Sequence, residues 1–355
     1  MKTILFAIAI AACGGGTKQG GTTPGAGSGA GSGSGSGISG SDSGSGSGAV
    51  TAGGGSDTGQ VNAGSATPEG PPIIFPNQDP DPAQVRSQVE QHLNVARSAL
   101  ASSTPDADTA LREAREALKL DASNLDAAAM IAFAYYHKKQ YDTAELVLDD
   151  LFKRPAAKEN ANVLYVYGLV YDKTNRPEQA VLAYQKAVAI KPDFASALVN
   201  LGVHQLENKQ YSEAQATFEK LTQSGRTDAV TVTSLASAYR GRSGDYAPGS
   251  AERNQYITQA EATYKRALAT DANYGPAYYD LALLYLDSDP FPSGGSTLDT
   301  MARLNAAKTY MDQYKNMPGV DIKLFDQREK EIDKATKRAQ KAAKKAAKAG
   351  KGGAP

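Results

Sequence analysis

Apolar side chains recur at helical spacing over most of the chain, from about Ala83 to Met317. They follow one another at intervals of three and four residues, which places them on one face of a helix. Proline and glycine cluster between these periodic runs, where helices end. The pattern also returns after about 34 residues, as Leu164 and Leu198 illustrate. A repeat of this length predicts stacked units of two helices each.

The clearest unit, 161–194, has a distinctive set of apolar and small residues. They are Leu164, Tyr167, Gly168, Tyr171, Ala180, Tyr184, Ala187 and Pro192. The next unit repeats this pattern with Gly202, Ala214 and Phe218. The pattern resembles the tetratricopeptide repeat nearly position for position. That resemblance implies an all-α fold, a superhelical solenoid of helix-turn-helix repeats. A generic helical bundle, the alternative, does not predict the return after about 34 residues.

We expect about five to six repeats over 83–319, the first of them a degenerate unit around Ala110. The clearest units are 125–160, 161–194, 195–228, 229–274 and 275–318. Inserts at 241–252 and 287–300 separate the two helices of the last two units. Inserts in solenoids fall in loops. Tyr246 and Phe291 in these inserts either form a second contact surface or belong to tolerated surface loops.

The segment from Gly14 to about Pro82 consists mostly of Gly, Ser, Thr and Ala and has almost no aliphatic side chains. It cannot bury a core, so the sequence predicts a disordered tether over 13–82. About 65 residues of this kind span roughly 45 Å on average. The glycines do not indicate a nucleotide-binding loop, because no strand-like run precedes them and no Gly-Lys-Ser/Thr follows.

The chain starts with Lys2 and an apolar run from Thr3 to Ala12, followed by Cys13, the only cysteine in the sequence. The run is too short to span a bilayer, which takes about 20 apolar residues, and it has the layout of a secretory signal. Ile10-Ala11-Ala12-Cys13 resembles the lipobox of bacterial lipoproteins. The resemblance implies a signal peptide over 1–12 and lipidation of Cys13. A mis-assigned start of a cytoplasmic protein, with a chance cysteine, is the alternative.

The whole chain has 38 basic and 38 acidic residues, but this balance is not local. From Lys334 to the C-terminus there are eight basic residues and no acidic one, so the remainder has a net charge of about −8. We expect a last helix from near Asp321, in which Ile322, Phe325 and Ile332 cover the open end of the solenoid. It continues into a Lys/Ala-rich tail, the two together forming 320–355.

Lysines in this tail recur every three or four residues and therefore lie on one side of a helix. A basic stripe of this kind attracts anionic lipid or cell-wall groups. The predicted anionic-surface residues are Lys334, Lys337, Lys341, Lys344, Lys345 and Lys348. A solvated, partly frayed tail is the alternative.

Few residues in the chain are candidates for catalysis or metal binding. His92, His137 and His204 each stand alone, without a second histidine or cysteine at ligand spacing. The sequence has no Gly-x-Ser-x-Gly motif. Acidic residues fall at helix starts and on exposed faces, where the helix dipole favours them. We therefore expect no enzyme, no cofactor, no metal site and no nucleic-acid partner.

In tetratricopeptide-repeat proteins the first helix of each pair lines a concave groove, and the resemblance implies such a groove here. The predicted partner-binding residues are Phe133, Tyr136, Tyr165, Leu169, Val199, Asn200, Val203, Tyr279 and Leu283. This lining is mostly apolar and aromatic, with few of the basic and amide residues that carboxylate-clamp members of the family use. We expect it to bind an apolar helix or an extended segment of a partner. Packing of these side chains on the neighbouring repeat is the alternative.

The sequence thus predicts a non-catalytic, lipid-anchored scaffold or assembly factor for an envelope complex, with protein partners in the groove. Its architecture resembles the tetratricopeptide-repeat lipoproteins of type IV pilus assembly and of myxobacterial gliding motility. That resemblance implies a location at the outer membrane, on its periplasmic side. The alternative function is a cell-wall or anionic-surface binding protein that acts through its basic tail.

Overall fold

The structure, a computed structural model, describes residues 81–102 and 104–351. The predicted signal peptide, Cys13 and nearly all of the predicted tether lie outside the described residues. The described residues form thirteen α-helices, one 3-10 helix and one short two-stranded hairpin. The all-α fold class is therefore confirmed. Within the described ranges, no helix is both long enough and apolar enough to cross a membrane.

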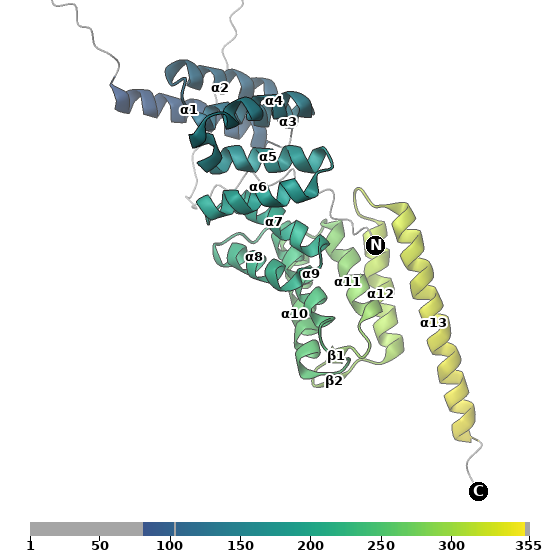
Figure 1. Ribbon diagram of the computed structural model, residues 1–355. Helices are drawn as coiled ribbons and strands as arrows, with labels where there is room; N and C mark the ends of the chain where they lie inside the picture. Colours follow the sequence, from purple (N-terminus) through teal and green to yellow (C-terminus); the bar gives the residue numbers. More distant parts are fainter. Residues whose placement is uncertain (1–80, 103, 352–355) are drawn as a thin grey trace, which may run out of the picture. The chain divides into compact units, whose positions relative to one another are not determined.

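The helices pack in sequential pairs, as in a tetratricopeptide solenoid (Figure 1). The pairs are α1 (Pro82–Ala101) with α2 (Ala107–Leu120), α3 (Leu125–His137) with α4 (Tyr141–Phe152), α5 (Ala161–Lys173) with α6 (Pro177–Ile190), α7 (Ala195–Glu207) with α8 (Tyr211–Gln223), α9 (Ala229–Ser243) with α10 (Ala251–Thr270), and α11 (Gly275–Asp287) with α12 (Thr300–Lys315). A 3-10 helix, η1 (Pro155–Glu159), precedes α5. Strands β1 (Pro292–Ser293) and β2 (Ser296–Thr297) pair antiparallel between α11 and α12. Helix α13 (Ile322–Lys351) follows the last pair and packs on α12.

One turn recurs between the two helices of a pair. Lys139, Asn175 and Lys209 each have a φ of 60° and end α3, α5 and α7. After each of them, the next backbone N–H donates to a carbonyl of the preceding helix, as Arg176 N does to Tyr171 O at 2.9 Å. This left-handed turn satisfies carbonyls that a helix end leaves without partners. The same turn thus connects the helices of three successive pairs, α3 with α4, α5 with α6 and α7 with α8.

Small residues let the paired helices approach closely. A Cβ atom added at Gly168 would lie 2.3 Å from Tyr184 Cε1, and one at Gly202 would lie 2.7 Å from Phe218 Cζ. Tyr184 and Phe218 are both fully buried. The glycines of the first helices therefore leave the space that the aromatic side chains of the second helices occupy.

The apolar core follows the pairs along the chain. Of the three residues expected to cover its end, Phe325 and Ile332 are 1% and 2% exposed, whereas Ile322 is 54% exposed. Ile322 is the first residue of α13 and its side chain stays in solvent, whereas Phe325, three residues later, is buried.

Candidate functional site

The first helices of successive pairs lie next to one another. Helix α3 contacts α5, α7 contacts α9, and α9 contacts α11. A hydrogen bond between Asp172 of α5 and His204 of α7 joins the two halves of this row. We call the side of this row formed by the residues at the predicted groove positions the first-helix face.

The structure buries most of the predicted groove residues. Eight of the nine are 9% exposed or less: Phe133, Tyr136, Tyr165, Leu169, Val199, Asn200, Tyr279 and Leu283. Val203 is half-buried. The aromatic members pack on one another, since the ring centroids of Phe133 and Tyr165 are 6.3 Å apart. These side chains contribute to the core between repeats, and their role in binding a partner stays a prediction.

Asp172 is the centre of a polar network on the first-helix face. Its carboxylate accepts a hydrogen bond from the Tyr184 hydroxyl at 2.6 Å, and His204 Nε2 lies 2.8 Å from its other oxygen. The second ring nitrogen of His204 lies 3.5 Å from Glu207 Oε2. Burial disfavours protonation of His204, but the hydrogen bond and charge of Asp172 outweigh it and raise the pKa of His204 above its ordinary value. The network therefore favours a positive charge between two carboxylates.

A second polar network joins α9, α10 and α11. Ser237 Oγ donates to Asp280 Oδ2 at 3.1 Å and lies 3.0 Å from the Tyr264 hydroxyl. Arg240 lies 3.7 Å from Asp280 and 2.8 Å from Asp287. Burial raises the pKa of Asp280, although the charge of Arg240 opposes this shift. The first-helix face is therefore more polar from α7 to α11 than the sequence predicts.

Some buried polar atoms of the first helices have no hydrogen-bond partner among the described residues. They include Tyr136 Oη, Asn200 Nδ2, Thr233 Oγ1 and Ser234 Oγ. Asn200 and Tyr136 are both 6% exposed. Most buried polar groups in folded proteins have partners. These atoms are closed off from solvent, so a partner could supply their acceptors only if the side chains around them moved.

The predicted basic stripe lies on α13, which continues to Lys351. All six predicted anionic-surface residues, Lys334 to Lys348, are exposed. Every residue from Lys341 to Lys348 is exposed, so this part of α13 extends past its packing contacts (Figure 1). A shallow cavity of about 420 Å³ lies along the part of α13 just before this exposed run. It is lined by Lys330, Asp333, Lys334, Lys337, Arg338 and Lys341.

Metal-binding geometry is not found in the described ranges. No group of three His, Cys, Asp or Glu side chains there could hold a metal ion. His92 pairs with Glu113 at 2.8 Å, and His204 pairs with Asp172. Both histidines thus have structural partners on neighbouring helices.

Residues 173–237 match the family model of the tetratricopeptide repeat. The chain therefore contains tetratricopeptide repeats, which typically are non-catalytic and form protein-interaction scaffolds. It follows that this chain is a repeat scaffold with protein partners. No curated protein matches the chain.

Three solved structures illustrate the similarity of the repeat architecture. A structure described as a functional characterization of Pseudomonas aeruginosa pilF has 18% identity and a TM-score of 0.48, and the match covers 66% of this chain and 95% of that one. A tetratricopeptide repeat protein from Parabacteroides merdae has 13% identity, covering 72% and 93%, with a TM-score of 0.44. A MamA protein has 18% identity, covering 53% and 94%, with a TM-score of 0.36. Similarity at this level does not identify a function.

Sequence reasoning missed the partnership between Asp172 and His204. The two residues are 32 positions apart and bring together the first helices of two repeats. It also missed Ser237 and Asp280, which are 43 positions apart. Polar residues about one repeat apart, both in first helices, are the signal that would have indicated these contacts.

Proposed function

We propose that this protein is a lipid-anchored scaffold of a bacterial envelope complex that holds a partner segment against the first-helix face. The observation that carries the proposal is the presence of buried donors without partners on that face, Tyr136 Oη and Asn200 Nδ2. Both atoms are inaccessible in the unbound chain, so binding would have to move the side chains around them before main-chain carbonyl oxygens of a bound segment supplied the acceptors they lack. A wholly apolar partner surface would leave both donors unsatisfied.

Tyr136→Phe together with Asn200→Leu tests this proposal, because each substitution removes the donor and nearly keeps the volume. Removing a buried donor without a partner leaves the free energy of unfolding unchanged or raises it. Loss of two hydrogen bonds to a partner should weaken binding about tenfold or more. The measurement is quantitative co-purification of partners from detergent-solubilised membranes, with urea unfolding of the same samples.

Tyr135→Phe is the matched control, because Tyr135 also lies on α3 and its hydroxyl has a partner, Arg115, at 3.5 Å. The control should retain the partner. Equal recovery of the same proteins by the double variant and the unchanged protein would exclude the first-helix donors from binding.

Alanine substitutions at the buried aromatic and aliphatic positions are poorer probes. Tyr165 and Leu169 are 5% and 1% exposed. Truncating them opens cavities that lower the free energy of unfolding by about 2–5 kcal/mol each. Loss of a partner by such a variant would not be distinguishable from loss of the fold.

Membrane attachment through Cys13 is supported by the sequence Ile10-Ala11-Ala12-Cys13 after a short apolar run. Cys13→Ser should move the protein from the membrane fraction to the soluble fraction. If both forms fractionate alike, this part of the proposal fails. Assembly of a pilus or a motility machine, at the periplasmic side of the outer membrane, is the finer role that this architecture suggests.

A second candidate function is binding of an anionic envelope surface through α13. It is favoured by the fully exposed run Lys341–Lys348, whose side chains stand clear of the helix pairs. Each lysine near an anionic membrane contributes on the order of 1 kcal/mol, and salt weakens the attraction. Replacing Lys341, Lys344 and Lys345 by Gln in the Cys13→Ser protein should weaken low-salt binding to phosphatidylglycerol vesicles by about 3 kcal/mol, seen as reduced sedimentation.

The control replaces three exposed lysines elsewhere, Lys158, Lys186 and Lys220, by Gln. This protein has the same net charge as the tail variant and should sediment normally. If the two variants sediment equally, net charge rather than α13 governs the attraction.

A further inference from the structure

The two inserts that interrupt the last repeats lie against each other. An added Cβ at Gly249, in the first insert, would be 3.6 Å from Pro290 Cγ in the second. Phe291 does not form an exposed contact surface, because it is 1% exposed and stacks on Tyr285 with ring centroids 4.4 Å apart. Tyr246 is half-buried and stacks on Tyr256 at 5.5 Å. Each insert therefore packs on a helix of its own repeat, and the two inserts meet at Gly249 and Pro290.

Arg303 holds the second insert in place. Its side chain is 6% exposed and donates to the carbonyl oxygens of Tyr285 and Leu286 at 2.7 and 2.8 Å. It also forms an ion pair with Asp289 at 3.0 Å. The hairpin that follows turns at Gly294 and Gly295, whose φ values of 54° and 83° glycine adopts without strain. Its position over α10 is thus fixed by packing and by charged hydrogen bonds.

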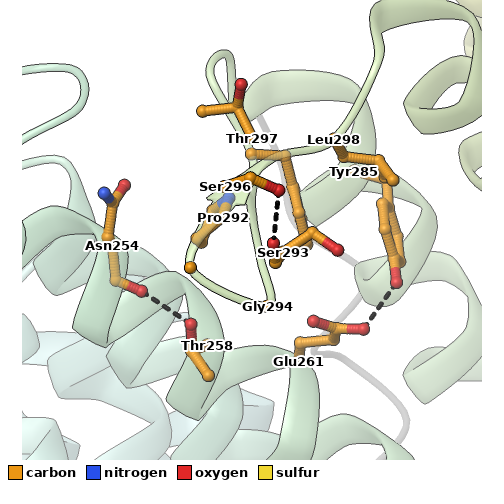
Figure 2. Close-up of a pocket in the computed structure, with 12 residues that line it drawn as sticks. Asn254, Thr258, Glu261, Tyr285, Pro292, Ser293, Gly294, Ser296, Thr297 and Leu298 are labelled. Atoms are coloured by element: carbon orange, nitrogen blue, oxygen red, sulfur yellow. Dashed lines mark hydrogen bonds between the residues drawn. The ribbon is translucent and has the colours of Figure 1, made fainter.

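A cavity of about 730 Å³ lies between this hairpin and α10 (Figure 2). Figure 2 shows the hairpin residues across the cavity from Thr258 and Glu261 of α10. Tyr285, Phe291, Pro292 and Leu298 form apolar parts of its wall. Ligand-binding pockets in proteins usually measure about 300–1,000 Å³. This cavity therefore has room for a long side chain and part of its backbone.

Glu261 is the only lining residue that is charged at neutral pH, and its side chain is 20% exposed. Its Oε1 accepts a hydrogen bond from the Tyr285 hydroxyl at 2.6 Å and pairs with Lys265 Nζ. No donor among the described residues reaches Oε2. The pocket therefore has one negative charge and one acceptor, Glu261 Oε2, without a donor in the part of the chain that the structure describes.

We propose that this cavity binds a lysine or arginine side chain of a partner protein, with the cationic head at Glu261. The apolar wall suits the methylene stem of such a side chain, which packs on apolar surface while its head stays with a polar partner. Hydrogen bonds between an ammonium or guanidinium group and a carboxylate are stronger than neutral ones. Lys265 already occupies one oxygen of Glu261, and it therefore competes with the incoming cation.

The probe is the peptide acetyl-Gly-Ser-Lys-Ser-Gly-amide, titrated into the isotopically labelled full chain that carries Cys13→Ser. Binding is followed through the amide resonances of Thr258, Gly294 and Gly295. We expect saturable shifts, with at least tenfold weaker binding of the same peptide containing norleucine in place of lysine. Glu261→Gln keeps an acceptor for Tyr285 and should weaken lysine-peptide binding tenfold or more.

Lys265→Met gives the opposite result, because it removes the competing internal cation and should tighten binding several-fold. Glu252→Gln, at the exposed start of the same helix, is the matched control and should leave binding unchanged. Equal affinity for the lysine and norleucine peptides, equal affinity of the Glu261→Gln variant, or no shift at all with millimolar lysine peptide would overturn the proposal.

Discussion

His204 should make the stability of the repeat array depend on pH. Its Nε2 lies 2.8 Å from Asp172 and its Nδ1 lies 3.5 Å from Glu207, and its side chain is 12% exposed. These carboxylates raise the pKa of His204 in the folded state against the opposing effect of burial. The folded state therefore holds this proton more tightly than the unfolded state does. The resulting stabilisation is complete below the unfolded pKa of about 6.5 and is lost as pH rises through the folded-state pKa.

His204→Gln removes the titrating group while it keeps an amide that can donate to Asp172. A hydrogen bond between charged groups contributes about 1.5–3 kcal/mol to stability, and a neutral one contributes about 0.5–1.5 kcal/mol. We therefore expect the substitution to lower the free energy of unfolding by the difference between the two, about 1 kcal/mol, near pH 5.5. At a pH above the folded-state pKa the loss should be much smaller, because His204 is then neutral in both states.

His137 provides a comparison of opposite sign. Its Nε2 has no partner among the described residues, and burial lowers the pKa of His137 in the folded state. Stability from a neutral buried histidine is present above the unfolded pKa and is lost as pH falls. His137→Gln should therefore reduce stability more at pH 8.5 than at pH 5.5.

The measurement is urea unfolding followed by circular dichroism, at several pH values between about 5 and 8.5. Only variants with the same dependence of free energy on urea as the unchanged protein are compared. The difference between His204→Gln and the unchanged protein should shrink with rising pH, while that for His137→Gln should grow. Parallel slopes for the two variants, or a loss at His204 that does not change with pH, would refute the reasoning.

Three further predictions concern packing. Gly168→Ala places a Cβ 2.3 Å from Tyr184. The overpacking costs about 1–3 kcal/mol, whereas alanine gains about 1 kcal/mol of helix propensity over glycine. Urea unfolding should therefore show a lower free energy of unfolding. Leu169→Ala, at a position 1% exposed, should lower the unfolding free energy by about 2–5 kcal/mol, and an unchanged value would contradict its place in the core. Arg303→Met should speed amide hydrogen exchange across 291–298 and leave exchange in α3 to α7 unchanged. Equal exchange rates across 291–298 in the variant and the unchanged protein would show that Arg303 does not hold the hairpin.

The first-helix face shows how far the sequence alone leads. The spacing of Leu164, Gly168, Ala180 and Tyr184 indicates paired helices, because helical periodicity and small contact residues are local properties of the chain. It also indicates which residues turn toward the neighbouring first helix. It does not indicate whether they stay exposed there, because burial depends on how closely the next repeat packs. Phe133, whose ring packs on Tyr165 of the next repeat, is 9% exposed, and Leu169 is 1% exposed.

The residues that matter most for chemistry were decided only by tertiary structure. Asp172 of α5 meets His204 of α7 because successive pairs stack through α6, and Glu261 meets Tyr285 because α10 packs on α11. Phe291 sits in an insert rich in Pro and Gly, whose composition resembles a surface loop, yet it is buried against Tyr285. Contacts between residues more than a helix apart depend on the stacking of whole repeats. The sequence by itself determines the repeat, and the stacking determines the networks and the cavity.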